Sequence, residues 1–195
     1  MKLVLATSNK GKVREIKALC SEYEVVPYSE IMEEFEIIEN GSTFKENALI
    51  KARAVFKALD DENIVVMADD SGISVDILDG KPGIFSARYA GENADDKDNL
   101  YKLMEDIKKK GVESSPAHYT AAVAIVTKMG ESCVHGWMYG KAITKAVGDG
   151  GFGYDPMFIP DGYTKTLGEL DEGVKQKLSH RSKALELAKI ILEAQ

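Results

Sequence analysis

Hydrophobic and polar residues follow one another along the chain in patterns that predict strands and helices from end to end. Residues 64–68 form a continuous apolar run, which is typical of a strand buried on both faces of a sheet. Apolar residues spaced three and four apart between Phe44 and Leu59 predict an amphipathic helix that opens at Ser42 and Thr43. Similar patterns predict strands at residues 2–6 and 23–26, helices at about 12–21, 95–110 and 180–193, and hairpin arms at 118–127 and 132–143 around Met129 and Gly130.

The order of these elements predicts the class of fold. Strands and helices are interspersed throughout, which indicates an α/β fold around a mixed β-sheet. No Pro- or Ser-rich linker interrupts the pattern, so we expect residues 1–195 to form a single domain. Thr43 and Glu46 have the spacing of a capping box at a helix start.

Composition narrows the classes of function. Apolar residues make up 44% and charged residues 29% of the chain, the balance of an ordinary globular protein. No apolar run approaches the roughly 18 residues of a membrane span, and the apolar stretch at the N-terminus is too short for a signal peptide. Cys20 and Cys133 lie far apart without a CxxC partner, which favours reduced thiols and a cytoplasmic location.

The formal net charge of −7 constrains the partners. An acidic surface repels nucleic-acid backbones, whose binding depends on Lys and Arg contacts, so we expect no nucleic acid as partner. The lack of a long apolar run predicts no membrane partner. An anionic substrate would therefore need a local cluster of positive charge or a metal ion.

One candidate cluster joins the first strand to the first helix and reads Thr7-Ser8-Asn9-Lys10-Gly11-Lys12. Free N–H groups and the dipole at a helix start favour an anion, and the lysines add positive charge. The loop is not a Walker A motif, because Ala6 replaces its first glycine and Val13 replaces the Ser or Thr that holds Mg²⁺. A simple polar turn with a helix cap is the alternative.

The second candidate is the acidic run Asp69-Asp70-Ser71-Gly72, which we predict to form a turn at the end of the buried strand. Ligands of α/β sheets gather at the carboxyl ends of strands, where carboxylates bind Mg²⁺ and activate water. Neighbouring residues on a regular strand point to opposite faces, so only one of the two aspartates can face the pocket. A purely structural turn is the alternative, since Asp, Ser and Gly favour turns. Glu39 or Glu46 could add a carboxylate, and the capping box already accounts for Glu46.

Two later segments could hold a nucleoside. The first is Gly150-Gly151-Phe152-Gly153-Tyr154-Asp155-Pro156, whose glycines let Phe152 lie exposed for a planar base to stack on while Asp155 contacts a polar edge. A flexible loop is the alternative. The second is Lys175 with Ser179-His180-Arg181, where a basic pair at a helix start either faces solvent or meets a polar or anionic group. We do not expect His180 to be a general base, because the sequence places no nucleophile beside it.

Together and in this order, these segments resemble the inosine triphosphate pyrophosphatase family, which removes deaminated purine nucleotides. The matching runs cover nearly the whole chain: Thr7-Ser8-Asn9 with Lys12, residues 44–48 leading to Lys51-Ala52-Arg53, residues 68–72, 82–89 and 151–156, and Ser179-His180-Arg181. The resemblance implies an Mg²⁺-dependent enzyme, usually a homodimer, that cleaves ITP, dITP and XTP to the monophosphate and pyrophosphate. It also implies an elongated mixed sheet flanked by helices, with two lobes and a central active-site cleft.

The resemblance further implies a role for each matching position. Asp70 is implied as the general base and a metal ligand, with Glu39 and Asp69 as further metal-ligand candidates. The alternative for Asp69 is a structural role instead of metal binding. The residues implied to bind substrate are Thr7, Ser8, Asn9, Lys10, Gly11 and Lys12 on the triphosphate, Lys51 and Ser71, and Phe152, Gly153, Tyr154, Asp155, Lys175, His180 and Arg181 around the nucleoside.

A mechanism follows from charge. Mg²⁺ and the lysines neutralise the triphosphate, and Asp70 orients or deprotonates a water molecule that attacks the α-phosphorus. Donors from His180, Arg181 or backbone N–H groups would favour the 6-oxo group of ITP and XTP over the amine of adenine. Two alternatives stay open. One is a hydrolase of modified pyrimidine triphosphates on the same scaffold, as in the septum-formation inhibitor family, and the other is a non-catalytic nucleotide-binding protein.

Overall fold

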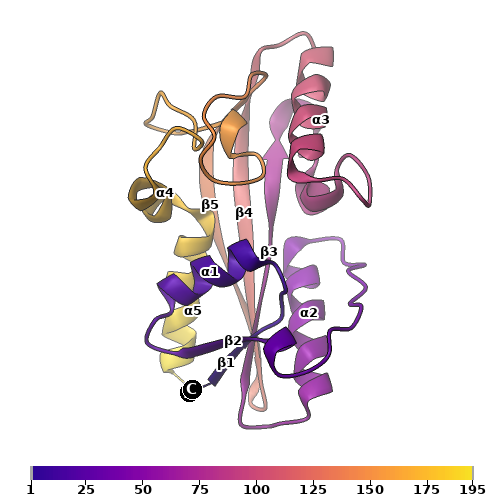
Figure 1. Cartoon of the computed structure of the whole chain (residues 1–195), viewed down its shortest axis with the longest axis vertical. Helices are drawn as coiled ribbons and strands as arrows, with labels where there is room; N and C mark the ends of the chain where they lie inside the picture. The colour runs from indigo at the N-terminus through magenta and orange to yellow at the C-terminus, as the bar shows by residue number, and fades with distance from the viewer. Residues whose placement is uncertain (1, 195) are drawn as a thin grey trace. The chain divides into compact units, whose positions relative to one another are not determined.

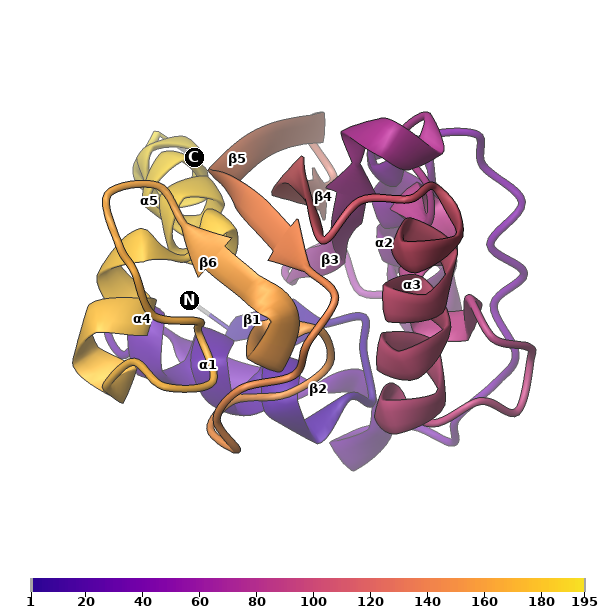
Figure 2. The same ribbon diagram turned by 90° about the horizontal axis from the view of Figure 1, so that it is seen from above.

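The computed structural model describes residues 2–194, within which six strands form one mixed sheet (Figure 1). Their order in the sheet is β2-β1-β3-β4-β5-β6. The strands are β1 (Lys2–Leu5), β2 (Glu24–Pro27), β3 (Val65–Val75), β4 (Ser114–Thr127), β5 (Gly130–Ile143) and β6 (Phe158–Pro160). β1 pairs in parallel with β2 and β3, whereas β6 is antiparallel to β5 (Figure 2). The predicted α/β fold with a mixed sheet is confirmed.

The helices are α1 (Lys10–Leu19), α2 (Phe44–Leu59), α3 (Asp96–Lys109), α4 (Glu172–Leu178) and α5 (His180–Glu193). α5 has the predicted bounds, and the hairpin arms β4 and β5 are longer than predicted. α1 begins earlier than predicted because the side chain of Asn9 caps it, accepting a hydrogen bond from the Lys12 N–H at 3.1 Å. The pattern of apolar residues did not predict α4 or β6.

The start of α2 differs in detail from the predicted capping box. Thr43 Oγ1 accepts the Glu46 N–H at 3.1 Å, as predicted. The Glu46 carboxylate reaches one residue further back, where it accepts hydrogen bonds from the N–H and hydroxyl of Ser42 at 2.6 and 2.7 Å. Glu46 therefore serves the helix start, and the capping explanation of this residue holds with a shifted partner.

Two compact units make up the chain. The first contains the described residues up to Asp70, residues 121–136 and those from Arg181 onward, and the second contains 71–120 and 137–180. The strands β3, β4 and β5 contribute residues to both units. The single domain expected for residues 1–195 stays a prediction.

In the first unit, strand alternation builds a core on each face of the sheet. Leu3, Leu5 and Met67 pack with α1 and α5, whereas Val4 and Val66 pack with α2. Figure 1 shows α1 and α5 together on one side of the strands and α2 on the other. In β1 and in the part of β3 that belongs to this unit, alternation therefore decides whether a side chain packs against α1 and α5 or against α2.

In the second unit, the core gathers around α3. Its buried Leu103, Met104 and Ile107 pack with Ile73 and Val75 of β3. The same core holds buried residues of β4, β5 and β6, of the segment between β5 and β6 and of the segment after β6: Ala117, Tyr119, Met138, Ala142, Tyr154, Met157, Phe158 and Leu167.

Both cysteines are free, with Cys20 buried and Cys133 partly buried, as the sequence predicted. None of the helices among residues 2–194 combines the length and the apolar composition that a membrane crossing requires.

Candidate active site

The acidic run does not form a turn at a strand end, so that prediction was wrong. β3 continues through Asp69, Asp70, Ser71 and Gly72 as far as Val75. The continuation depends on Gly72, because a Cβ at this position would lie 2.4 Å from Ser86 Oγ and 2.5 Å from the Gly83 carbonyl oxygen. Ser86 Oγ in turn accepts the Ile73 N–H at 3.0 Å. A polar run that resembles a turn is thus held as a strand by tertiary contacts.

Because the strand is regular, the two aspartates point to opposite faces, as the sequence predicted. Asp70 lies on the α2 side, where the ammonium of Lys51 contacts its Oδ1 at 2.8 Å. The same ammonium contacts Glu39 Oε2 at 3.0 Å. Lys51 therefore links the two carboxylates that the sequence marked as metal candidates, and Glu39 rather than Glu46 is the glutamate at this site.

Burial sets the electrostatics of this group. Asp70 is 9% exposed, and burial raises the pKa of its carboxyl, against the opposing charge and hydrogen bond of Lys51. Burial would lower the pKa of Lys51, but Asp70 and Glu39 together raise it, so the lysine carries its charge. Burial therefore makes the Asp70 carboxylate a stronger base, and the positive charge of Lys51 stays beside it.

The free oxygen of Asp70 fits a metal ion or a water molecule. No residue of the described chain donates a hydrogen bond to Asp70 Oδ2, although this oxygen is buried. Residues 2–194 contain no group of three or more His, Cys, Asp and Glu side chains placed to hold a metal. Two carboxylates with an open oxygen suit Mg²⁺, which keeps several waters and binds through one or two carboxylates together with substrate phosphates. Asp70 and Glu39 therefore form an oxygen donor set that fits Mg²⁺.

Asp69 lies on the α1 and α5 side and is 1% exposed. Its Oδ2 contacts the Lys12 ammonium at 2.7 Å, and its Oδ1 lies 3.3 Å from Arg181 Nε. Burial would raise the pKa of Asp69, but Arg181 and Lys12 hold it far below its ordinary range. Arg181, which is 3% exposed, also forms an ion pair with Glu15. The structure thus separates Asp69 from Asp70 and Glu39 and places it in an ion-pair network.

The loop of residues 7–12 has the predicted form of a strand-to-helix connection with a cap. Thr7 Oγ1 accepts the Asn9 N–H at 3.2 Å, and Asn9 caps α1. Lys10 and Gly11 provide the first N–H groups of α1, which have no carbonyl partner within a helix. Thr7 and Asn9 use their side chains to shape the turn. The groups of this loop that attract an anion are therefore the lysines and the free backbone N–H groups.

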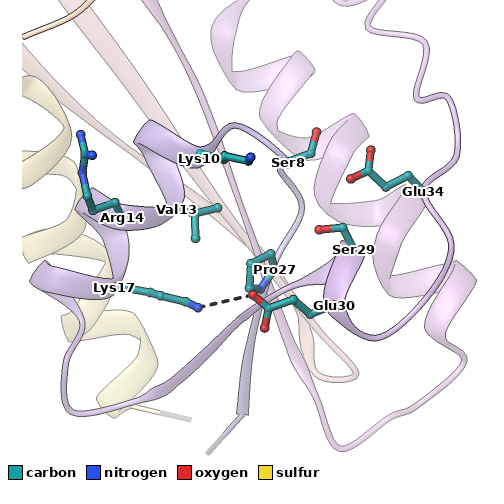
Figure 3. Close-up of a pocket in the computed structure, with 9 residues that line it drawn as sticks. All are labelled: Ser8, Lys10, Val13, Arg14, Lys17, Pro27, Ser29, Glu30 and Glu34. Carbon is teal, nitrogen blue, oxygen red and sulfur yellow. Dashed lines mark ion pairs between the residues drawn. The ribbon is translucent and has the colours of Figure 1, made fainter.

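A pocket of about 450 Å³ lies beside this loop (Figure 3). Its lining combines basic and acidic side chains: Ser8, Lys10, Val13, Arg14, Lys17, Pro27, Ser29, Glu30 and Glu34. Lys17 and Glu30 approach to 3.7 Å across it. The pocket includes Ser8 and Lys10 but neither Asp70 nor Lys51, so the candidate chemistry lies outside it.

In the second unit, the glycine-rich loop presents Phe152, which is 49% exposed. Asp155 Oδ2 accepts the Phe152 N–H at 3.2 Å, and Asp96 Oδ2 on α3 accepts the Gly153 N–H at 3.1 Å. The Tyr154 hydroxyl donates to the Ser86 carbonyl at 2.7 Å, so that side chain is anchored in the core. The ring is exposed as predicted, and its stacking on a base stays a prediction. Tyr154 and Asp155 shape the loop that carries the ring.

Lys175 and His180 lie at α4 and at the start of α5. The Lys175 ammonium approaches the glycine-rich loop, since it would lie 3.7 Å from a Cβ at Gly150, and it pairs with Glu172 at 3.0 Å. The His180 ring stacks on Tyr119, with ring centroids 4.8 Å apart and planes 12° from parallel.

In each unit, some residues that hold the candidate segments in place were given no role by sequence reasoning. Asp96 resembles an ordinary acidic residue in a first helical turn, and Glu15 resembles a solvated residue on an amphipathic helix. Ser86 and Tyr119 have the composition of core and strand positions. The neighbouring sequence does not indicate the role of any of these residues, because each contacts a segment that is distant in the chain.

Known proteins are similar to this chain over nearly its whole length. A family model described as the Ham1 family matches residues 3–190. The dITP/XTP pyrophosphatase of Sulfurimonas denitrificans is 68% identical over 197 residues, which cover 99% of this chain and 99% of that protein. The dITP/XTP pyrophosphatase of Sulfurovum sp. is 59% identical, covering 99% of this chain and 94% of that protein.

Solved structures show the same fold. The Ham1 protein of Staphylococcus aureus matches with a TM-score of 0.88 at 36% identity, covering 100% of this chain and 99% of that chain. A HAM1 protein of Coxiella burnetii matches with a TM-score of 0.89 at 34% identity, covering 100% of both chains.

Proposed function

The chain belongs to the Ham1 family, and from that premise we propose that it hydrolyses ITP, dITP and XTP to the monophosphate and pyrophosphate with Mg²⁺. The observation that carries the proposal is the environment of Asp70. This buried carboxylate has one oxygen held by Lys51 and a second, buried oxygen that no described residue occupies. A carboxylate oxygen has two lone pairs, so a group of this kind can bind a cation and also take a proton from water.

In this proposal Asp70 and Glu39 would hold Mg²⁺, and the charge of the bound ion would stabilise the triphosphate and the departing pyrophosphate. Lys51 orients Asp70 through its contact with Oδ1, and its charge favours the ionised carboxylate against the effect of burial on the pKa. Asp70 orients a water molecule and accepts its proton, while the water oxygen bonds to the α-phosphorus and the bond to the pyrophosphate oxygen breaks. Asp69 is not a metal ligand here, because Lys12 and Arg181 contact its oxygens on the other face of β3.

The remaining matched residues bind the substrate. The N–H groups at the start of α1, together with Lys10 and Lys12, neutralise phosphate oxygens, and Thr7, Ser8, Asn9 and Gly11 shape or line that loop. Lys51 and Ser71 contact the substrate beside Asp70. Phe152 stacks on the base, with Gly153, Tyr154 and Asp155 presenting it. Lys175, His180 and Arg181 supply the donors that select a 6-oxo purine.

The enzyme is further proposed to act in the cytoplasm as a homodimer. Two free thiols suit a reducing compartment, and the inosine triphosphate pyrophosphatase family implies the dimer. Sedimentation equilibrium of the purified chain measures the mass directly, and a monomer at micromolar concentration would refute the dimer.

The deciding experiment is pyrophosphate release from a panel of nucleoside triphosphates, with Mg²⁺ or with excess chelator. We expect release from ITP, dITP and XTP in the presence of Mg²⁺ and a much lower kcat/KM for ATP. Comparable kcat/KM for ITP and ATP would refute the base selection. Orthophosphate as the product would refute attack on the α-phosphorus, and preference for a modified pyrimidine would indicate the related hydrolase activity instead.

A further inference from the structure

We propose that Asp69 is a positioning residue that acts on the substrate through Lys12, holding this lysine ready for the triphosphate. The inference rests on the proposed function, in which Lys12 binds phosphate, but it concerns a neighbour of Asp70 that performs no chemistry itself. The Lys12 ammonium contacts Asp69 twice, at 2.7 Å from Oδ2 and 3.4 Å from the main-chain carbonyl oxygen. Asp69 therefore binds the Lys12 ammonium with both its side chain and its main-chain carbonyl.

The other carboxylate oxygen of Asp69 also has a charged partner. Its Oδ1 lies 3.3 Å from Arg181 Nε, and the Arg181 guanidinium is paired with Glu15. Lys12 and Glu15 are three residues apart on α1, so they lie on the same face of that helix. The four side chains thus alternate in sign, from Lys12 through Asp69 and Arg181 to Glu15, and connect α1, β3 and α5.

Burial makes this arrangement rigid. The Asp69 side chain is fully buried, Arg181 is 3% exposed and the Lys12 side chain is 18% exposed. Charges in such surroundings stay ionised only when each has a partner, and moving one leaves another uncompensated. The cluster is neutral as a whole, with two cations and two carboxylates, so it holds its geometry without an external ion.

The consequence for binding is preorganisation. A lysine on a flexible stem loses conformational freedom when it binds an anion, and a lysine already held in place loses less. Asp69 takes up part of the donor capacity of the ammonium, which has three donors, and the rest stays available to phosphate. The Asp69 carbonyl that accepts from Lys12 belongs to the peptide unit joining Asp69 to Asp70 in β3. The contact therefore holds the Lys12 ammonium close to the backbone of Asp70.

The test is a double-mutant cycle on Asp69→Asn and Lys12→Met. Asp69→Asn keeps the shape of the side chain and removes its charge. We expect it to raise the KM for ITP and the Kd for inorganic pyrophosphate by about tenfold to a hundredfold, with a smaller fall in kcat. In the Lys12→Met background the same substitution is expected to change the Kd for pyrophosphate by less than about twofold, because its route to phosphate through Lys12 is gone.

A purely structural role would give a different result. If Asp69 only stabilised the fold, its coupling with Lys12 would appear in the free energy of unfolding, and the KM and the pyrophosphate Kd of the folded variants would give an additive cycle. Additivity in KM and in pyrophosphate affinity overturns the proposal, as does unchanged pyrophosphate affinity in Asp69→Asn alone. Glu131→Gln is the matched control, since it breaks an exposed ion pair with Arg53 in the same unit and is expected to leave both constants unchanged.

Circular dichroism and thermal unfolding establish that each variant is folded. If Asp69→Asn does not fold, Glu15→Gln replaces it in the cycle. It weakens the other end of the cluster and is expected to give a smaller change of the same sign that disappears in the Lys12→Met background. An additive cycle or no change with Glu15→Gln then overturns the proposal. Binding of pyrophosphate by calorimetry needs no turnover, so an inactive wild-type chain would refute the proposed function and leave this test intact.

Discussion

Gly72→Ala adds a single methyl group, and the structure predicts that it destabilises the fold. The added Cβ would lie 2.4 Å from Ser86 Oγ, 2.9 Å from Ser86 Cβ and 2.5 Å from the Gly83 carbonyl oxygen. Because one of these atoms belongs to the backbone, a change of side-chain rotamer cannot relieve the clash. β3 or the segment around Ser86 must move.

The magnitude follows from the contacts that such a movement breaks. Ser86 Oγ accepts the Ile73 N–H at 3.0 Å and donates to the Gly83 carbonyl at 2.6 Å. Overpacking a core costs about 1–3 kcal/mol, and a lost buried hydrogen bond adds about 1 kcal/mol. We therefore expect Gly72→Ala to lower the free energy of unfolding by about 2–4 kcal/mol, a large share of the roughly 5–15 kcal/mol of a typical domain.

Urea unfolding followed by circular dichroism measures this change. A loss of this size moves the midpoint down by roughly 1–2 M at an ordinary m-value. Gly173→Ala is the matched control, because a Cβ there meets nothing within 4 Å and alanine favours its helix α4. If Gly72→Ala moved the midpoint no more than Gly173→Ala, the close approach of Ser86 to β3 would be refuted.

Three further predictions concern the proposed chemistry and the buried charges. Asp70→Asn is expected to lower kcat by about a thousandfold or more with an unchanged circular dichroism spectrum, since the general base is lost; turnover near the wild-type value would exclude that role. Phe152→Ala is expected to raise the KM for ITP by about 5-fold to 150-fold, from about 1–3 kcal/mol of stacking. Tyr101→Ala, which removes another exposed ring from the same unit, is its control. The pKa of Asp69 is lowered in the folded chain, so its stabilisation is present at neutral pH and is lost as the pH falls through and below its ordinary pKa of 3.8, where the unfolded chain takes up a proton first. Urea unfolding between pH 6 and pH 3 measures this loss, and an equal pH dependence in Asp69→Asn would contradict it.

Local periodicity accounts for what the sequence predicted well. The amphipathic patterns of α2, α3 and α5 and the buried run of β3 each depend on residues within a few positions of one another. The elements that were missed, α4 and β6, are short and carry little hydrophobic pattern. Alternation along β3 separated Asp69 from Asp70 correctly because that rule needs only a regular strand.

The acidic run is where local reasoning and structure diverge most. The sequence by itself determined that two aspartates would follow a buried strand and point to opposite faces. Only the tertiary structure decided that the strand continues, because Ser86 packs against Gly72 and bonds to the Ile73 N–H.

The tertiary structure also decided which partner each aspartate has. Lys51 reaches Asp70 and Glu39 from α2, and Lys12 and Arg181 reach Asp69 from α1 and α5. The sequence contains all of these charges, but their pairing depends on which helix packs on which face of the sheet. That packing is set by hydrophobic contacts between segments distant in the chain, so a local pattern predicts the charged residues without predicting their pairs.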